Sequence, residues 1–134
     1  MMTTELKKIN LAVPHDWLTP LRKQAFRLQL KIDDFVSLGV VEFIRCLPDA
    51  YFDYMDADLP DPLDNEDQTF EVLALMIHQQ WSTLLEIEAK TLEVTPLALL
   101  YISLLWLADQ PEDDEHLLKA KISQSWLAPI QVQG

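Results

Sequence analysis

The chain has 134 residues, of which 49% are hydrophobic and 24% are charged, and its formal net charge is −12. This length suits one compact domain or two very small ones, and it is sufficient for a hydrophobic core. With two glycines and one cysteine, the composition excludes a glycine-rich phosphate-binding loop, an internal disulfide and a zinc site built from cysteines. The sequence shows no secretion signal and no apolar run of the ~20 residues that a membrane span needs. We therefore expect a cytoplasmic protein with no membrane partner.

Charge is distributed unevenly along the chain. Residues 1–48 hold seven Lys and Arg against five Asp and Glu, whereas residues 49–134 hold three Lys against 17 Asp and Glu. The first part is therefore at +2 and the second at −14, which suggests that the two parts face different partners. The acidic part should repel nucleic acid, whose binding depends on neutralising phosphates. Alternatively, the acidic surface only keeps an apolar chain in solution.

Residues 7–13 alternate between two faces, a pattern that is typical of a β-strand. One face carries Ile9, Leu11 and Val13, and the other carries Lys8, Asn10 and Ala12. A lone strand cannot satisfy its backbone, and no second strand is predicted nearby. We therefore expect this segment either to pair with its copy in another chain or not to form a strand.

Two helices are predicted next. Thr19-Pro20 resembles an N-cap followed by a proline at the first helical position, so the first helix is expected over residues 20–30. Asp33 is a second capping candidate, and the helix that follows it is predicted over residues 34–47. Gly39 inside that helix costs ~1 kcal/mol relative to Ala and indicates close helix packing. The apolar stripe of this second helix consists of Val36, Val40, Phe43, Ile44 and Leu47.

Residues 49–67 form an acidic, proline-interrupted connector with embedded aromatics, which is the best candidate for a domain boundary. Beyond it, a long helix is predicted over residues 68–92, buried on more than one side. Thr95-Pro96 repeats the cap-and-proline signal and begins a helix to Ala108 that is apolar all round, as expected of a central helix. A final helix is predicted from residue 109 onwards, with acids in its first turn that suit the helix dipole.

Together these patterns predict a mainly α fold, a compact helical domain of four to five helices with at most one short N-terminal strand. Residues 1–48 form a strand plus helix–helix module that could dimerise, and residues 49–67 are the connector. Residues 68–134 form an acidic helical region that packs on the first part or on a partner. Apart from the two Thr-Pro helix starts, the sequence shows no internal repeat.

No residue pattern points to catalysis, a cofactor or a metal. Glu112, Asp113 and His116 share one helical face, but no matching ligands are predicted on other helices, and the helix dipole explains the acids. The connector aspartates lack the glycine that a calcium-binding EF-hand loop needs. Cys46 is expected to be a small core residue, and His78 a helix histidine with satisfied hydrogen bonds. We predict that the protein is not an enzyme and has no catalytic, cofactor-binding or metal-binding residues.

The stretch Lys8-Ile9-Asn10-Leu11-Ala12-Val13-Pro14, followed by two helices, resembles the ribbon-helix-helix family, the Arc and MetJ class of dimeric DNA-binding repressors. The resemblance covers the first 48 residues and implies a homodimer in which two copies of the strand form an antiparallel ribbon. It also implies that Lys8, Asn10 and Ala12 face bases in the major groove and that the start of the second helix faces a phosphate. The helix positions that carry the resemblance are Leu18, Leu21, Ala25, Val36, Val40 and Ile44.

Two functional interpretations follow. In the preferred one, the chain is a non-catalytic acidic protein that acts through protein–protein interaction, as an adaptor, assembly chaperone, inhibitor or mimic. Its partner has a basic or apolar groove, and the contact residues are Tyr51, Phe52, Asp53, Tyr54, Asp56 and Asp58. In the alternative, the chain is a dimeric DNA-binding transcriptional regulator or antitoxin with an acidic partner-binding region. DNA is a partner only under this alternative, and its contacts are Lys7, Lys8, Asn10 and Ala12.

Overall fold

The computed structural model describes residues 5–45, 47–60, 69–111 and 115–128. The fold is mainly α-helical, as predicted, with one two-stranded sheet. No single described helix is long and apolar enough to cross a membrane, and α4 and α5 pass that test only as a pair bent by 102°. The elements in chain order are β1 (Leu6–Pro14), α1 (His15–Arg27), α2 (Ile32–Arg45), α3 (Leu47–Phe52), β2 (Phe70–His78), α4 (Gln79–Thr91), α5 (Pro96–Ala108), α6 (Glu115–Ser123) and the 3-10 helix η1 (Ser125–Leu127).

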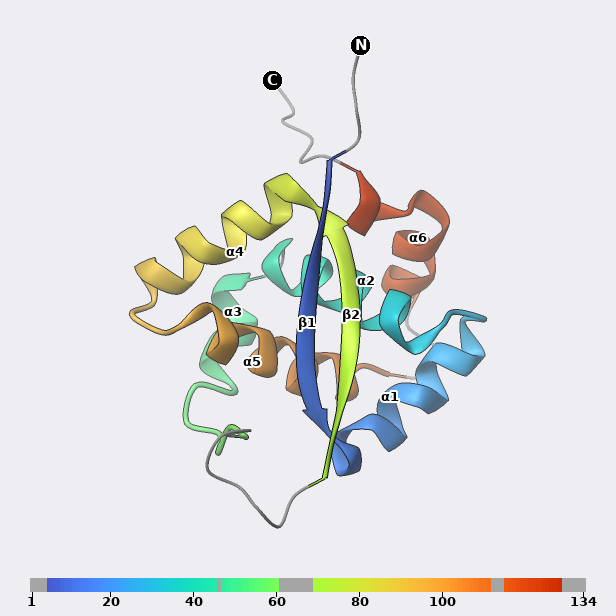
Figure 1. Cartoon of the computed structure of the whole chain (residues 1–134), viewed down its shortest axis with the longest axis horizontal. Coiled ribbons are helices and arrows are strands. Elements are labelled where there is room, and N and C mark those ends of the chain that lie inside the picture. The colour runs from blue at the N-terminus through green and yellow to red at the C-terminus, as the bar shows by residue number, and fades with distance from the viewer. Residues whose placement is uncertain (1–4, 46, 61–68, 112–114, 129–134) are drawn as a thin grey trace.

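The strands β1 and β2 form an antiparallel ribbon that lies across the helices (Figure 1). The register runs from Leu6 opposite His78 to Pro14 opposite Phe70. The predicted N-terminal strand is therefore confirmed. Its partner belongs to the same chain, so the expectation that it pairs with a copy in another chain is wrong.

The strand β2 corrects two predictions, the long helix over residues 68–92 and the limit of one strand. Its inward residues Leu73, Leu75 and Ile77 are buried in the core. Its outward residues are Val72, Ala74 and Met76, which are apolar as well. The alternation that marks a half-buried strand is therefore missing from the sequence, and a short apolar run does not distinguish a strand from a buried helix.

The chain folds as two strand–helix–helix units with matching elements, β1–α1–α2 and β2–α4–α5. Gln29 and Glu93, in the turns between the helices, adopt nearly identical left-handed φ angles of 58° and 60°. Asn10 lies opposite Ala74, which is the equivalent residue of the second unit, 64 positions later in the chain. An approximate two-fold axis therefore passes through the middle of the ribbon. The expectation of no internal repeat is thus wrong at the level of structure. Each element of the second unit begins 64 residues after its counterpart, as for Leu6 and Phe70, His15 and Gln79, and Ile32 and Pro96.

The two Thr-Pro signals have different outcomes. α1 begins at His15, directly after the ribbon, so the helix start predicted at Thr19-Pro20 is wrong and Pro20 lies inside the helix. Pro20 lies beyond the first turn, where it cannot donate a hydrogen bond to the carbonyl of Asp16 and its ring crowds that carbonyl. In the second unit the signal is correct, because Thr95 Oγ1 caps α5 by accepting a hydrogen bond from Ala98 N at 3.0 Å.

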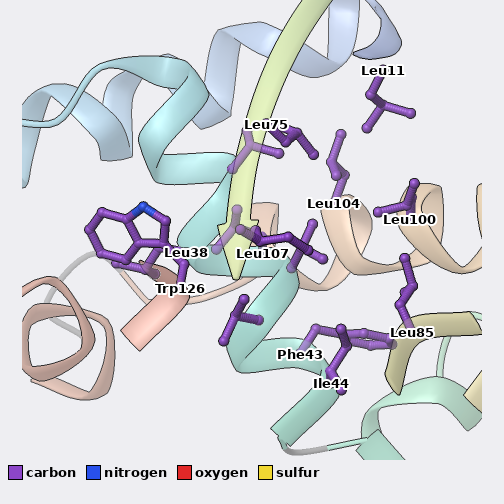
Figure 2. Packing of buried hydrophobic residues seen from close by; sticks show 14 of the residues in the cluster. Leu11, Leu38, Phe43, Ile44, Leu75, Leu85, Leu100, Leu104, Leu107 and Trp126 are labelled. Atoms are coloured by element: carbon purple, nitrogen blue, oxygen red, sulfur yellow. The ribbon is translucent and has the colours of Figure 1, made fainter. Parts of the chain in front are cut away.

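The helix α2 is central, and its residues 35–44 are all buried. It packs against the ribbon, α5, α6 and η1. At Gly39 a Cβ atom would lie 2.2 Å from Leu107 Cδ2 of α5, so the close packing predicted there is confirmed. Figure 2 shows how side chains of α2, α5 and both strands, among them Leu38, Leu107 and Leu75, meet in one core.

Two ion pairs join the units at equivalent positions. Lys7 of β1 pairs with Glu86 of α4 at 3.9 Å, and Arg22 of α1 pairs with Glu71 of β2. Lys7 and Glu71 are counterparts, and so are Arg22 and Glu86. The first unit therefore supplies both cations and the second both anions, whereas two copies of the first unit would place Lys against Arg. The uneven charge of the chain thus favours pairing of the two different units over pairing of identical ones.

Reversing one of these charges should weaken the fold, and reversing its partner should restore it. Arg22→Glu loses the attraction to Glu71 and adds repulsion, so we expect the free energy of unfolding in urea at low salt to fall by about 0.5–1 kcal/mol. The double variant Arg22→Glu/Glu71→Arg should recover most of the loss. Lys23→Glu, at the neighbouring exposed position, is the matched control. Equal losses in the single and double variants would show that the pair is not coupled.

Candidate protein-binding surface

One face of the ribbon packs on the helices, and the other is turned away from them (Figure 1). We call the middle part of the second face the outer ribbon face, and its residues are Lys8, Asn10, Ala12, Val72, Ala74 and Met76. Lys8, Asn10 and Val72 are exposed, and the other three are half-buried. With 64% of its surface accessible, Val72 is a large exposed apolar side chain on a protein whose net charge is −12.

Cross-strand pairing arranges this face in three rows. Asn10 and Ala74 lie opposite each other in the middle row, Lys8 pairs with Met76 in the second, and Ala12 pairs with Val72 in the third. Side chains opposite each other in an antiparallel pair are in contact, so the four apolar residues form one continuous strip. Ala74, which lies between Val72 and Met76 along β2, has a short side chain. Apolar patches with a polar rim mark interaction sites.

The structure separates the four residues that the alternative interpretation places at DNA. Lys8, Asn10 and Ala12 share the outer ribbon face, but Lys7 points to the opposite side and pairs with Glu86. The counterparts of the three shared residues on β2 are Val72, Ala74 and Met76, and none of them has a side-chain hydrogen-bond donor. The polar residues Lys8 and Asn10 of β1 therefore have no polar equivalents on β2.

The connector residues predicted to contact a partner are also divided. Tyr51 is buried, although its neighbour Phe52 is 63% exposed. Tyr54 is half-buried, and its hydroxyl donates a hydrogen bond to Asp109 Oδ2. Among the predicted residues, those accessible to a partner are Phe52 and the exposed acids Asp53, Asp56 and Asp58.

Burial, together with the hydrogen bond to Asp109 and its charge, raises the pKa of Tyr54 to about 12. The folded state therefore favours the neutral phenol. Its contribution to stability is complete below pH ~10, the ordinary pKa of tyrosine, and is lost as the pH rises towards 12. We expect Tyr54 to ionise near pH 12 in an ultraviolet titration. Asp109→Asn should lower that pKa only in part, because burial remains, and an unchanged titration curve would contradict the contact.

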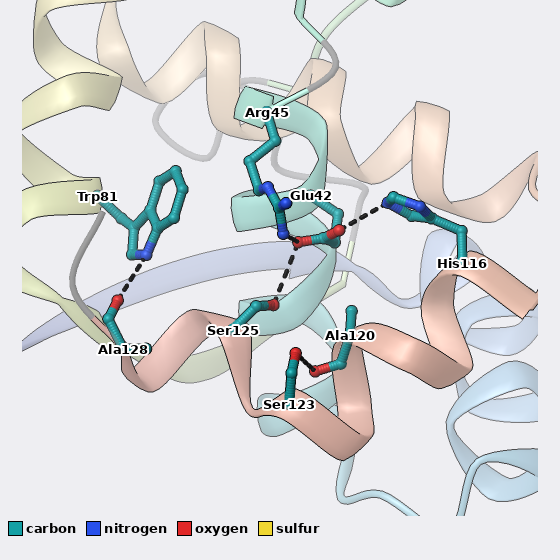
Figure 3. A network of polar contacts seen from close by, with 8 residues as sticks. All are labelled: Glu42, Arg45, Trp81, His116, Ala120, Ser123, Ser125 and Ala128. Atoms are coloured by element: carbon teal, nitrogen blue, oxygen red, sulfur yellow. Dashed lines mark hydrogen bonds and ion pairs between the residues drawn. The ribbon is translucent and has the colours of Figure 1, made fainter. Parts of the chain in front are cut away.

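A buried carboxylate, which sequence reasoning missed, holds the C-terminal elements to α2 (Figure 3). Glu42 is 1% exposed, and its Oε2 accepts hydrogen bonds from Arg45 Nη1 at 3.2 Å and from Ser125 Oγ at 3.1 Å. Its Oε1 lies 2.6 Å from Nε2 of His116 on α6. Burying a carboxylate is tolerated when such donors surround it. The cluster therefore anchors α6 and η1 on the central helix.

The sequence signal for this anchor is weak. It consists of one acid, Glu42, inside an otherwise apolar helix, while two of its partners lie more than 70 residues away along the chain. The sequence groups His116 with Glu112 and Asp113, which are outside the described residues. Within the described part of the chain, no group of three or more His, Cys, Asp or Glu could hold a metal ion.

Removal of the Glu42 carboxylate should loosen the C-terminal elements. In Glu42→Ala, the donors of Arg45, His116 and Ser125 lose their acceptor, and we expect the free energy of unfolding to fall by about 2–4 kcal/mol. Amide hydrogen exchange should accelerate more in α6 than in α4. Glu115→Ala, an exposed acid on α6, is the matched control. Equal acceleration in both helices would contradict the anchoring role.

Of the two residues weighed as catalytic candidates, His78 and Cys46, the structure describes His78. His78 ends β2 and caps α4, with its Nδ1 accepting a hydrogen bond from Gln80 N at 3.1 Å. It is therefore satisfied, as predicted, although it lies before the helix and not within it. Cys46 falls outside the described residues.

In comparisons with family models, curated proteins and solved structures, the chain matches none of them.

Proposed function

We propose that the protein binds a partner protein on the outer ribbon face and acts through this interaction, without catalysis. The observation that supports this most is the apolar strip around Val72, whose side chain is 64% exposed. Covering such surface in an interface is favourable by about 25 cal/mol per Å². The core does not require apolar residues here, because the inward residues of β2 already supply it. An adaptor, assembly chaperone, inhibitor or mimic in the cytoplasm fits this description.

The arrangement of the two units supports a relation to the ribbon-helix-helix proteins. In that family, each of two chains supplies a strand and two helices, and the strands pair as a ribbon that is placed in the DNA groove. We propose that the present chain is a single-chain counterpart, with both units in one polypeptide. The ribbon within the chain then takes the place of the ribbon that a homodimer would form.

DNA binding is the alternative, and the chemistry of the outer ribbon face argues against it. Bases are read chiefly through hydrogen bonds, and only Lys8 and Asn10 of the six residues have side-chain donors. Asp33 and Asp34, in the first turn of α2, would approach the phosphates that this helix faces in the family. The net charge of −12 adds to the repulsion. A protein surface that is apolar where it meets the strip fits better.

Site-specific crosslinking tests the proposed surface. We expect a photoreactive phenylalanine analogue at position 72 to form adducts with one defined protein in the native host, and the same analogue at position 122 to form none with it. Ile122 is a matched control because it is an apolar residue, 74% exposed, on α6. Met76→Lys should remove the adducts at position 72, since it places a charge in the strip. Equal labelling from both positions would refute the proposed surface.

Fluorescence anisotropy with duplex DNA at low salt decides between the two functions. The proposal predicts no saturable binding, because the charge of the chain opposes it. Saturable binding that disappears in Lys8→Ala/Asn10→Ala would overturn the proposal and establish the DNA-binding alternative.

A further inference from the structure

We infer that the outer edge of β1 receives an extended segment of the partner protein, which joins the ribbon as a third strand. This inference rests on the proposed function and specifies how the partner docks. It follows from a difference between the two edges of the ribbon. Among the described residues, α2 closes the edge of β2 through Asp33 and Ser37, whereas none covers the edge of β1 between Leu6 and Asn10.

The hydrogen bonds at the two ends of the ribbon fix which backbone groups point to the edges. The N–H of His15 donates to Thr69 O at 3.0 Å, and the N–H of Gln79 donates to Glu5 O at 2.8 Å. Bonded and non-bonded pairs alternate in an antiparallel ladder, so the odd-numbered residues of β1 bond to β2. The N–H and C=O groups of the even-numbered residues therefore point away from β2, and these residues are Leu6, Lys8, Asn10 and Ala12.

On β2, the corresponding N–H groups already donate hydrogen bonds to side chains of α2. The N–H of Ala74 donates to Asp33 Oδ2 at 3.3 Å, and the N–H of Met76 donates to Ser37 Oγ at 3.1 Å. Both acceptors belong to the first turns of α2, which packs along this edge. A further strand could pair here only by displacing the central helix.

The second unit places different side chains at the equivalent positions beside β1. The counterpart of Asp33 is Leu97, which has no acceptor. The counterpart of Ser37 is Tyr101, whose hydroxyl donates to Ala12 O at 2.6 Å and closes only that end of the edge. In the described parts of the chain, the backbone of Lys8 and Asn10 has no hydrogen-bond partner outside the ribbon.

Burial shows the same difference between the edges. Ile9 faces the helices and is half-buried, whereas its counterpart Leu73 is 1% exposed. Asn10 is exposed, whereas its counterpart Ala74 is half-buried. Leu97, at the start of α5, is 46% exposed. Among the described residues, none covers the outer side of Ile9, where an added strand would lie.

These groups define the chemistry of the added strand. Open strand edges bind extended peptides through main-chain hydrogen bonds, and alternate side chains give specificity. On the inner side of the ribbon, the side chain of the added strand that lies next to Ile9 is apolar. On the outer side, the side chain of the added strand that lies next to Lys8 is a carboxylate, because Lys8 makes no ion pair among the described residues, whereas Lys7 does. A second copy of β1 is disfavoured, since it adds a like charge beside Lys8 and brings two chains of net charge −12 together.

The probe for this inference is a short peptide selected from a random phage-displayed library against the full-length chain. In the unbound protein, we expect the amides of Lys8 and Asn10 to exchange with solvent about tenfold faster, or more, than those of Ala74 and Met76. The peptide should slow exchange at Lys8 and Asn10 and shift their amide resonances. Equal exchange on both edges of the unbound protein would overturn the inference without any ligand.

A pair of variants separates the edge N–H from the side chain. Asn10→Pro removes the N–H, and proline is accepted on edge strands, while Asn10→Ala retains it. We expect Asn10→Pro to bind the peptide about tenfold or more weakly than Asn10→Ala does, because both variants lack the amide side chain and only Asn10→Pro also lacks the edge N–H. Unchanged helix resonances confirm that a variant is folded, and the exchange measurement on the unmodified chain stands if Asn10→Pro does not fold.

The outcomes distinguish the inference from the proposed function. A peptide could shift the resonances of Val72 and Met76 but leave amide hydrogen exchange at Lys8 and Asn10 unchanged. This result would overturn the edge inference and leave the proposed function standing. Peptides that change the resonances of neither Val72 and Met76 nor Lys8 and Asn10, or a library that yields no binder, would count against both the edge inference and the proposed function.

Discussion

The pairing of β1 with β2 inside one chain is the constraint on which the rest of the structure depends. A two-stranded ribbon is not stable alone and must cover one face, and here it does so by burying residues such as Leu11 and Leu75 against the helices. Because Asn10 lies opposite its own counterpart Ala74, the helix pairs that follow the strands are placed by the same two-fold axis. The contact of α2 with α5 at Gly39 is a consequence of that placement.

Matching elements with different side chains give the two units different roles. Ser37 is short, so α2 lies directly against β2, whereas its counterpart Tyr101 spans the distance from α5 to Ala12 with its ring. The ion pair between Arg22 and Glu71 likewise depends on the units being different. The surface proposed to bind a partner lies where β2 carries apolar residues in place of the polar ones of β1. The proposed binding surface therefore depends on side chains that differ between equivalent positions of the two units.

The sequence predicted those elements whose signals are local. The alternation in β1 and the Thr95 cap of α5 each depend on a few neighbouring residues, and both were correct. β2 was missed because its outward residues are apolar, as its inward ones are, and such a segment also fits a helix. The feature that hid β2 from the sequence is therefore the same apolar strip that marks the candidate site.

The remaining features depend on contacts between distant residues. Nothing near Glu42 in the sequence indicates that His116 and Ser125 will meet it. The repeat is also hidden, because the matching positions are mostly occupied by different residues of similar size or burial. Trp17 and Trp81, Leu21 and Leu85, and Ala25 and Ala89 are among the positions at which the residue is retained. The open edge of β1 could be recognised only after the register of the ribbon was known.

The most direct test of the single-chain ribbon is a nuclear Overhauser measurement between the α-protons of Asn10 and Ala74. These residues form a non-hydrogen-bonded pair, in which the Cα atoms of antiparallel strands are about 4.5 Å apart. We predict a strong cross-peak that persists when a labelled chain is diluted into excess unlabelled chain, because both protons belong to one molecule. Loss of the cross-peak on dilution, together with its appearance between differently labelled chains, would contradict the account.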